Sequence, residues 1–277
     1  MATAQGLRYR IAKSKVRVPL VWYRHRALSP GDVFVGAYPR SGSTWLRFLL
    51  LEVLSGQCAE FDSVNTLLPS VGEHRGSPAL LPGGGRLIKT HENYRPEYRK
   101  AVYLVRDARD VLLSEYAYQK AKGWFESDFD SYLLAFLKGK VNAYGSWQEH
   151  VRDWTEAASR SANILVLRYE PMRQNTVAAL EKVFQFIGVE VGREQLQKAV
   201  DSNSLERMKA KEDKSRQLRQ DRFVRSGSVR GWEGKLTAAQ LQLIDRYAGA
   251  SLAVLGYPTG NSLTPQPTSE LSSQFAS

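Results

Sequence analysis

The stretch YPRSGSTW at residues 38–45 contains the side chains best suited to bind a charged ligand. It separates an apolar run at 32–38 from a helical pattern that begins near residue 43. Small residues let successive backbone N–H groups converge on an anion at the start of a helix, where the helix dipole favours negative charge. Hydroxyls and a permanently charged guanidinium add further donors. The alternatives are an ordinary capped turn and a phosphate site formed by Arg40, Ser41, Gly42, Ser43 and Thr44.

The loop differs from the phosphate loop of nucleoside-triphosphate enzymes. That motif needs glycines five residues apart, followed by lysine and then serine or threonine. Here Gly36 and Gly42 are six residues apart, and Ser43 follows Gly42 directly. The pattern predicts a phosphate cradle without the lysine that contacts the β- and γ-phosphates, and with no clear magnesium arrangement. A nucleoside or small-molecule kinase stays an alternative, which tight binding of magnesium-ATP would support.

A second group with possible chemistry is KTH at residues 89–91. His91 directly follows an apolar run, and a neutral imidazole with its ordinary pKa near 6.5 suits a proton acceptor at neutral pH. Lys89 lies two residues earlier, so in an extended strand both side chains point to the same face. The alternatives are a loop histidine bonded to backbone and a lysine that faces solvent.

Four short apolar runs, typical of buried parallel strands, separate these polar groups. Helical patterns lie between them, so we expect a single α/β domain with a central parallel sheet, helices on both of its faces and the phosphate loop after the first strand. Ligands of such sheets bind at the carboxyl ends of the strands. The predicted strands are 32–38, 86–90, 101–106 and 163–169. The predicted helices are 43–54, 110–121, 147–160, 171–187, which starts on a proline and ends at Gly188, and about 237–255.

Composition limits the class of protein. The chain has 277 residues and 39 Lys and Arg against 28 Asp and Glu, which suggests an anionic partner. A single cysteine excludes a disulfide framework and favours a reducing compartment, so we expect a cytoplasmic protein. No apolar run approaches the roughly 18 residues of a membrane span. We expect a basic segment at 1–31, a catalytic domain at 32–258 and a disordered tail at 259–277 that is rich in Ser, Thr, Pro and Gln.

Taken together, the motifs resemble the sulfotransferases that use 3′-phosphoadenylyl sulfate (PAPS), of the soluble, bacterial-like, small-molecule type. The resemblance spans roughly residues 32–257, and five motifs in order are far more specific than one. The loop at 38–45 is similar to the family's phosphosulfate loop, usually written Y-P-K-S-G-T-T-W. The other segments are KTH (89–91), YLVRDARDVLLSEY (103–116), RYEPM (168–172) and FVRSGSVRGW (223–232).

The resemblance implies a role for each matching residue. His91 would be the general base, Lys89 would contact the transferring group, and Arg40 would stabilise the leaving phosphate oxygen. Arg106 and Ser114 would hold the 3′-phosphate of PAPS and of its product PAP, although Arg106 could instead pair with Asp107 or Asp110. The residues implied around the rest of the nucleotide are Trp45, Tyr169 and Ser204, with Arg225, Ser226 and Gly227 in a lid. No metal is implied.

Several positions depart from the family pattern, among them Arg230 and Gly231, which replace the second glycine and the aspartate of the late segment. Arg40 replaces the family lysine, so it can clamp a phosphate but not donate a proton. In the late segment Ser226 replaces a lysine, and in NSLERM (203–208) Leu205 replaces an aromatic residue. The family's C-terminal dimerisation pattern is absent, so the sequence leaves the oligomeric state open.

The acceptor also stays open. A phenol, an alicyclic alcohol or a nitrogen of a small molecule, including a natural product, would all suit the chemistry. A basic nucleic-acid-binding protein is a second alternative, because seven Lys and Arg and no acid lie between residues 8 and 26. No recognised nucleic-acid motif accompanies them, so we expect no nucleic-acid partner.

Overall fold

The computed structural model describes residues 17–216 and 227–260 of the chain. Its centre is a parallel sheet of four strands in the order β2-β1-β3-β4. The register pairs Val35 of β1 with Lys89 of β2 on one side and with Val102 of β3 on the other. The strands are β1 (Val33–Ala37), β2 (Leu87–Thr90), β3 (Ala101–Val105) and β4 (Ile164–Arg168). All four predicted strands are therefore confirmed, as is the parallel α/β fold.

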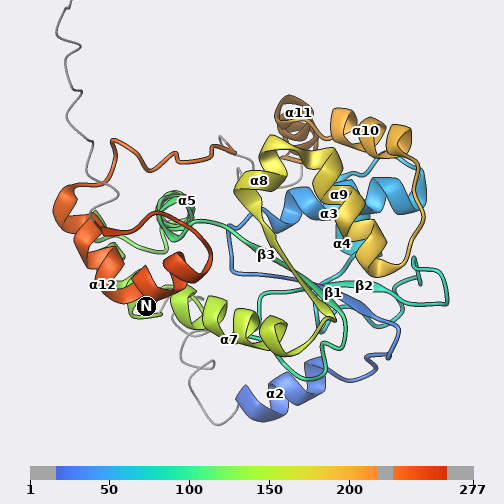
Figure 1. Ribbon diagram of the computed structural model, residues 1–277, viewed down its shortest axis with the longest axis horizontal. Helices are drawn as coiled ribbons and strands as arrows, with labels where there is room; N and C mark the ends of the chain where they lie inside the picture. The colour runs from blue at the N-terminus through green and yellow to red at the C-terminus, as the bar shows by residue number, and fades with distance from the viewer. Residues whose placement is uncertain (1–16, 217–226, 261–277) are drawn as a thin grey trace, which may run out of the picture.

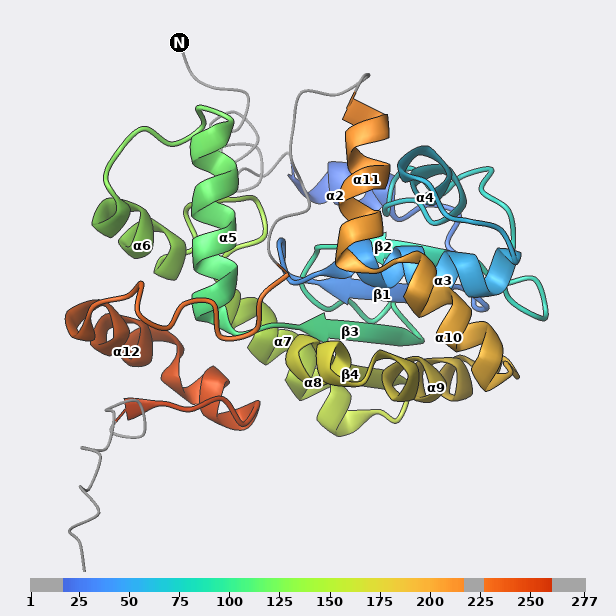
Figure 2. The same cartoon turned by 90° about the horizontal axis from the view of Figure 1, so that it is seen from above.

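Helices cover both faces of the sheet (Figure 1). The core on one face includes Leu46, Leu50 and Leu180, and the core on the other includes Trp147 and Trp154. The helices that supply the first face and its rim are α3 (Ser43–Ser55), α4 (Phe61–Leu67), α8 (Tyr169–Gln174), α9 (Thr176–Ile187), α10 (Arg193–Ser202) and α11 (Leu205–Arg216). The others are α2 (Arg17–Arg24), α5 (Ala108–Ala121), α6 (Phe129–Leu137), α7 (Trp147–Arg160) and α12 (Ala238–Val254). Figure 2 shows α3, α10 and α11 on the side of β1 and β2, α8 and α9 beside β4, and α5, α6 and α12 together on the opposite side of the molecule.

Local signals explain where most helices begin and end. Helix α7 starts with a capping box, in which Ser146 and Glu149 satisfy each other's backbone N–H groups. Helix α3 ends at Gly56, whose left-handed backbone allows its N–H to donate to the Glu52 carbonyl at 3.0 Å. These two helices have nearly the predicted bounds.

The single helix predicted over 171–187 is wrong, because the segment forms two helices. Helix α8 already begins at Tyr169, and Asn175 separates it from α9. Asn175 has a non-helical backbone, and its side chain accepts the N–H of Ala178 at 3.1 Å, so it caps α9. The predicted end at Gly188 is correct. Tyr169 directly follows the last residue of β4 and begins α8.

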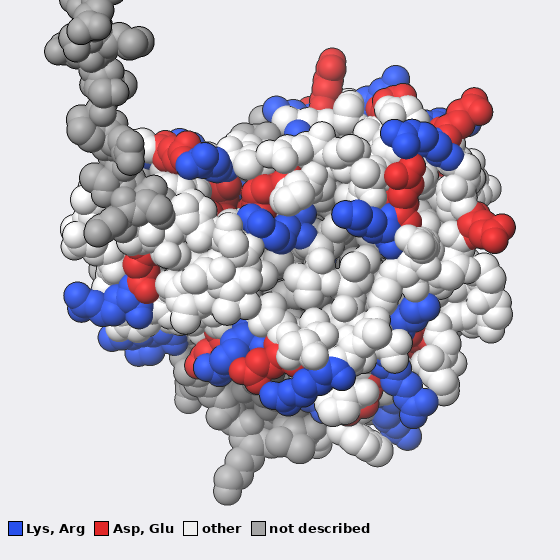
Figure 3. Space-filling view, viewed as in Figure 1, with Lys and Arg blue, Asp and Glu red and all other residues white. Residues whose placement is uncertain are grey.

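The molecular surface mixes charges of both signs. On the face in Figure 3, basic side chains are interspersed with acidic ones around a central hollow. No helix within residues 17–216 and 227–260 is long and apolar enough to cross a membrane. Of the predicted outer segments, residues 1–16 and 261–277 lie outside the described residues.

Candidate active site

A cavity of about 310 Å³ lies at the carboxyl edge of the sheet. A polar or aromatic group follows the end of each strand and lines it: the loop that begins at Tyr38 after β1, His91 after β2, Arg106 after β3 and Tyr169 after β4. Parallel strands bring their carboxyl ends to one edge, which explains why residues 130 positions apart meet. The cavity lies at the edge where the sequence analysis expects the site, and the binding roles of its residues stay predictions.

Gly42 gives the loop after β1 its shape. Its φ of 97° is unfavourable for residues with a side chain, and a Cβ placed there would lie 2.7 Å from the Tyr169 ring. Gly42 therefore lets the loop approach Tyr169 closely while leading into α3, and Ser43 and Thr44 line the cavity beside it. Ser41 does not line the cavity. It is fully buried, and its hydroxyl has no hydrogen-bond partner among the described residues.

Arg40 is held over the cavity by helix α5. Its Nε donates to Ser114 Oγ at 3.2 Å, and its guanidinium lies 4.8 Å from the centre of the Tyr118 ring. Its backbone has a φ of 67°, which is uncommon for a residue with a side chain. Ser114, expected beside the 3′-phosphate with Arg106, is thus bonded to Arg40 in this structure.

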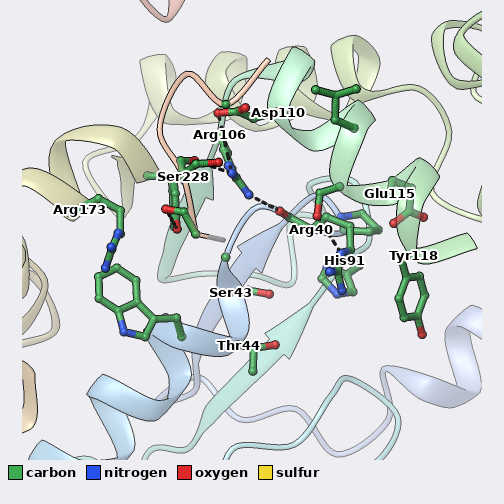
Figure 4. Close-up of a pocket in the computed structure, with 18 of the residues that line it drawn as sticks. Arg40, Ser43, Thr44, His91, Arg106, Asp110, Glu115, Tyr118, Arg173 and Ser228 are labelled. Atoms are coloured by element: carbon green, nitrogen blue, oxygen red, sulfur yellow. Dashed lines mark hydrogen bonds and ion pairs between the residues drawn. The ribbon is translucent and has the colours of Figure 1, made fainter. Parts of the chain in front are cut away.

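Arg106 forms a fixed cation at the end of β3. One guanidinium nitrogen donates to the Ser228 carbonyl at 2.8 Å, and another donates to the Arg40 carbonyl at 3.4 Å (Figure 4). The guanidinium also lies 4.6 Å from the centre of the Tyr169 ring. Asp110 is 3.8 Å away, and burial raises the pKa of this carboxyl to about 6. Of the two ion pairs considered from the sequence, the pair of Arg106 with Asp110 is present. Asp107 instead pairs with Arg109 at 2.6 Å.

Two aromatic residues border the cavity at its far side. Trp45 and Tyr169 meet edge to face with ring centres 6.3 Å apart, and Arg173 lies 4.8 Å from the Trp45 ring centre. The Trp45 indole N–H donates to the Asn203 carbonyl at 2.8 Å. Trp45 is therefore bonded within the protein and also lines the cavity. The Tyr169 hydroxyl donates to the carbonyl of Gly227, which also lines the cavity.

Of the remaining predicted nucleotide residues, only Ser204 lies within the described part of the chain. Ser204 accepts the Arg207 N–H at 3.3 Å at the start of α11, which makes it a helix cap, and it does not line the cavity. Arg225 and Ser226 lie outside the described residues.

His91 has a defined tautomer at the opposite side of the cavity. Its Nδ1 is 2.5 Å from the Ala37 carbonyl, which can only accept, so Nδ1 carries the proton and Nε2 keeps a lone pair. Burial, reinforced by the charge of Lys89, lowers the pKa of His91 well below the usual 6.5. From the sequence we expected an ordinary imidazole pKa for His91. In the structure this pKa is lower, so the ring stays neutral at more acidic pH. The alternative considered from the sequence, a histidine bonded to backbone, is also partly right, because Nδ1 of His91 donates to the Ala37 carbonyl.

Lys89 shares this setting. Burial, with a smaller effect from nearby Arg47, lowers the pKa of Lys89 to about 7. Lys89, His91 and Tyr144 line both the main cavity and a second cavity of about 480 Å³. Apolar side chains of Leu20 and Val21 contribute to the second cavity. Lys89 and His91 therefore lie between the two cavities.

Several lining residues escaped sequence analysis. They are Glu115, Tyr118, Asn142, Tyr144, Arg173 and Ser228. Tyr118 follows Ser114 by one helical turn, as Arg173 follows Tyr169, so the i, i+4 spacing was an available signal. Asn142 and Tyr144 lie in a loop without a recognisable motif, and only the tertiary fold brings them to the site.

Comparison with known proteins decides the family. Residues 30–256 match the family described as the sulfotransferase domain. This chain belongs to the sulfotransferase family. This sulfotransferase is 30% identical to the guinea pig (Cavia porcellus) 3-beta-hydroxysteroid sulfotransferase over 251 residues, covering 82% of this chain and 85% of that protein. It is 28% identical to the mouse (Mus musculus) sulfotransferase 2A1, covering 83% of this chain and 86% of that protein.

Solved structures agree with this assignment. The mouse sulfotransferase SULT7A1 complexed with PAP has a TM-score of 0.67 and 26% identity, with 84% of this chain and 88% of that chain covered. Retinol dehydratase in complex with androsterone and PAP has a TM-score of 0.69 at 20% identity, with 83% and 82% covered, which shows the same fold. The predictions of an enzyme of the sulfotransferase family and of its fold are confirmed.

Proposed function

We propose that this sulfotransferase moves a sulfuryl group from PAPS to a hydroxyl or nitrogen of a small-molecule acceptor and releases PAP. The observation that supports this proposal most directly is the meeting of the Gly42 loop, Arg106 and His91 at one sheet edge in a chain of this family. The residues fit an anionic nucleotide: Gly42 has no Cβ to fill the loop, and Arg106 Nε is buried without a partner among the described residues.

The donor would lie across the loop after β1. The backbone at Gly42 and the hydroxyls of Ser43 and Thr44 would hold its 5′-phosphosulfate at the start of α3. Arg106 would hold the 3′-phosphate, since its guanidinium is fixed at the end of β3. Trp45 and Tyr169 would border the adenine.

The reaction needs a proton acceptor and charge stabilisation. His91 Nε2 would take the proton of the acceptor group as the bond from that group to sulfur forms and the bond between sulfur and the bridging phosphate oxygen breaks. Lys89 and Arg40 would offset the negative charge left on the phosphate oxygen. Nδ1 cannot act as the base, because its proton is bonded to Ala37.

The acceptor would occupy the second cavity. Lys89, His91 and Tyr144 border both spaces, so an acceptor there would face the donor across the catalytic pair. The lining combines apolar Leu20 and Val71 with charged Arg24, Glu73 and Glu92. This lining suits an acceptor with an apolar frame and a polar substituent. A cytoplasmic location and a role in natural-product biosynthesis stay predictions.

The decisive experiment combines calorimetry with an acceptor screen. We expect PAP to bind without magnesium and more tightly than ATP, and labelled PAPS to transfer its sulfuryl group to a subset of phenols, alcohols and amines detected by mass spectrometry. Tight binding of magnesium-ATP without binding of PAP would instead support the kinase alternative. Binding of duplex DNA with steep salt dependence would revive the nucleic-acid alternative.

A further inference from the structure

Helix α7 directs a row of three buried donors at the backbone beyond the strands. Trp147, His150 and Trp154 have the spacing i, i+3 and i+7, so they share one helix face, and all three are fully buried. The Trp147 indole N–H donates to the Arg106 carbonyl at 3.2 Å, and the Trp154 indole N–H donates to the Glu92 carbonyl at 3.2 Å. None of the three donors lines either of the two cavities described above. Helix α7 therefore contacts the backbone at both ends of the site from outside it.

His150 makes the third of these contacts, to the carbonyl of His91. Its Nε2 is 3.1 Å from this oxygen, which can only accept, so Nε2 carries the proton. Its Nδ1 keeps a lone pair and accepts the hydroxyl of buried Tyr103 at 3.0 Å. Burial lowers the pKa of His150 to about 4 and raises the pKa of Tyr103, so both groups are neutral at neutral pH. The hydrogen bonds therefore run in one direction, from Tyr103 through His150 to the His91 carbonyl.

This contact lies where the pairing of β1 with β2 stops. The register of the two strands ends at Gly36 and Thr90, so His91 is the first residue beyond it. The His91 ring is held separately, because its Nδ1 donates to the Ala37 carbonyl. One contact fixes the backbone of His91 and the other fixes its ring. Together they determine the direction of Nε2, which neither contact determines alone.

Close packing keeps α7 at the depth that these contacts need. The Trp154 and Tyr103 rings are stacked, with centres 4.8 Å apart and planes inclined by 3°. A Cβ at Gly36 would lie 2.6 Å from the Trp154 ring, so the glycine in β1 lets this ring approach the sheet. His150 is therefore attached to a helix that packs directly on the strands, and its own position is well defined.

We propose that His150 is a positioning residue for His91: its bond to the His91 carbonyl holds the backbone so that the ring presents Nε2 to the acceptor. The proposal rests on the role of general base proposed for His91. Trp147 offers an internal comparison, because it holds the Arg106 carbonyl from the same helix face. Loss of His150 should affect turnover, whereas loss of Trp147 should affect nucleotide affinity. A merely structural row would affect both quantities alike at both positions.

The first test compares variants of α7 by steady-state kinetics and by calorimetry with PAP. His150→Phe keeps a planar ring without the donor, so kcat should fall about tenfold through lost orientation of the base, with PAP affinity within about twofold. His150→Gln offers an amide N–H to the same carbonyl and should bring kcat back to within about threefold of the parent. Glu156→Gln, in an exposed ion pair with Arg160, is the control and should change neither quantity.

Trp147→Phe should give the opposite pattern to His150→Phe. It removes the indole donor to the Arg106 carbonyl, so PAP should bind about two- to fivefold more weakly, as expected for one lost hydrogen bond, with kcat within about twofold. The same loss of PAP affinity in His150→Phe, or an unchanged kcat in that variant, would overturn the proposal.

A second variant separates positioning from stability. His150→Phe leaves the Tyr103 hydroxyl buried without its acceptor, which lowers the melting temperature. The double variant His150→Phe/Tyr103→Phe removes both polar groups, so its melting temperature should return toward that of the parent while kcat stays low. Recovery of kcat together with the melting temperature would show that His150 is structural and would overturn the proposal.

A double-mutant cycle with His91→Asn tests whether His150 acts through His91. In that background no base is left to orient, so His150→Phe should change kcat by less than about twofold. A further tenfold loss, equal to that in the parent background, would overturn the proposal. Absence of both PAP binding and PAPS turnover in the parent would instead reject the proposed function.

Discussion

At one end of the cavity Arg106 donates to two backbone carbonyls and lies over the Tyr169 ring. At the other end Lys89 and His91 are withdrawn from water, and the pKa of each is lowered. The first arrangement holds a permanent cation in one direction, as binding of a phosphate requires. The second adjusts protonation, as proton transfer requires. The two ends should therefore respond differently to substitution and to pH.

The largest expected effect separates chemistry from binding at His91. His91→Asn should lower kcat by about 10²–10⁴, the usual contribution of a positioned proton acceptor, while leaving PAP affinity within about twofold. The fall in kcat should be smaller for an acceptor that is already ionised at neutral pH, because its proton is already gone. Steady-state kinetics and calorimetry on one preparation provide the measurement. A lower melting temperature with weaker PAP binding and near-normal kcat would mean that His91 is structural.

The opposite pattern is expected at Arg106. Arg106→Ala should weaken PAP by about 1.5–3 kcal/mol, the usual value for a hydrogen bond to a charged group. Adenosine 5′-phosphosulfate, which lacks the 3′-phosphate, should bind almost equally to parent and variant. Equal losses of affinity for both nucleotides would show that Arg106 stabilises the loop and does not bind the 3′-phosphate.

The pH dependence of kcat/KM sharpens the contrast. His91 must be neutral and Lys89 charged, so activity should fall on the acid side only well below pH 6.5 and on the alkaline side as pH rises through about 7. Lys89→Arg should keep its charge and shift the alkaline fall upward by more than one unit. An unchanged alkaline limb in this variant would remove Lys89 from the assignment.

The smallest effect is expected at the aromatic border. Arg173 lies over the Trp45 ring, and a cation–π contact at a partly exposed site contributes about 0.5–1 kcal/mol. Arg173→Met should therefore weaken PAP by only about two- to fivefold without a change in kcat. Arg193→Met, in an exposed ion pair with Glu181, is the matched control. A large loss of kcat would place Arg173 at the reacting centre instead.

Local pattern was enough to predict much of this molecule. The four strands, the polar groups after them and the bounds of α3 and α7 depend on residues close in sequence, so periodicity reveals them. The family motifs likewise lie within short segments. The break at Asn175 was missed because helical periodicity continues on both sides of it, and the sequence alone does not show that Asn175 caps a second helix.

The tertiary structure decided which charges meet and how they titrate. Ser114 was expected at a phosphate and is bonded to Arg40, because α5 packs against the loop after β1. The lowered pKa values of Lys89 and His91 arise from burial by segments distant in sequence. Residue type sets which groups can titrate, but the loss of water and the distance to other charges set where they do so, and both follow only from the folded chain.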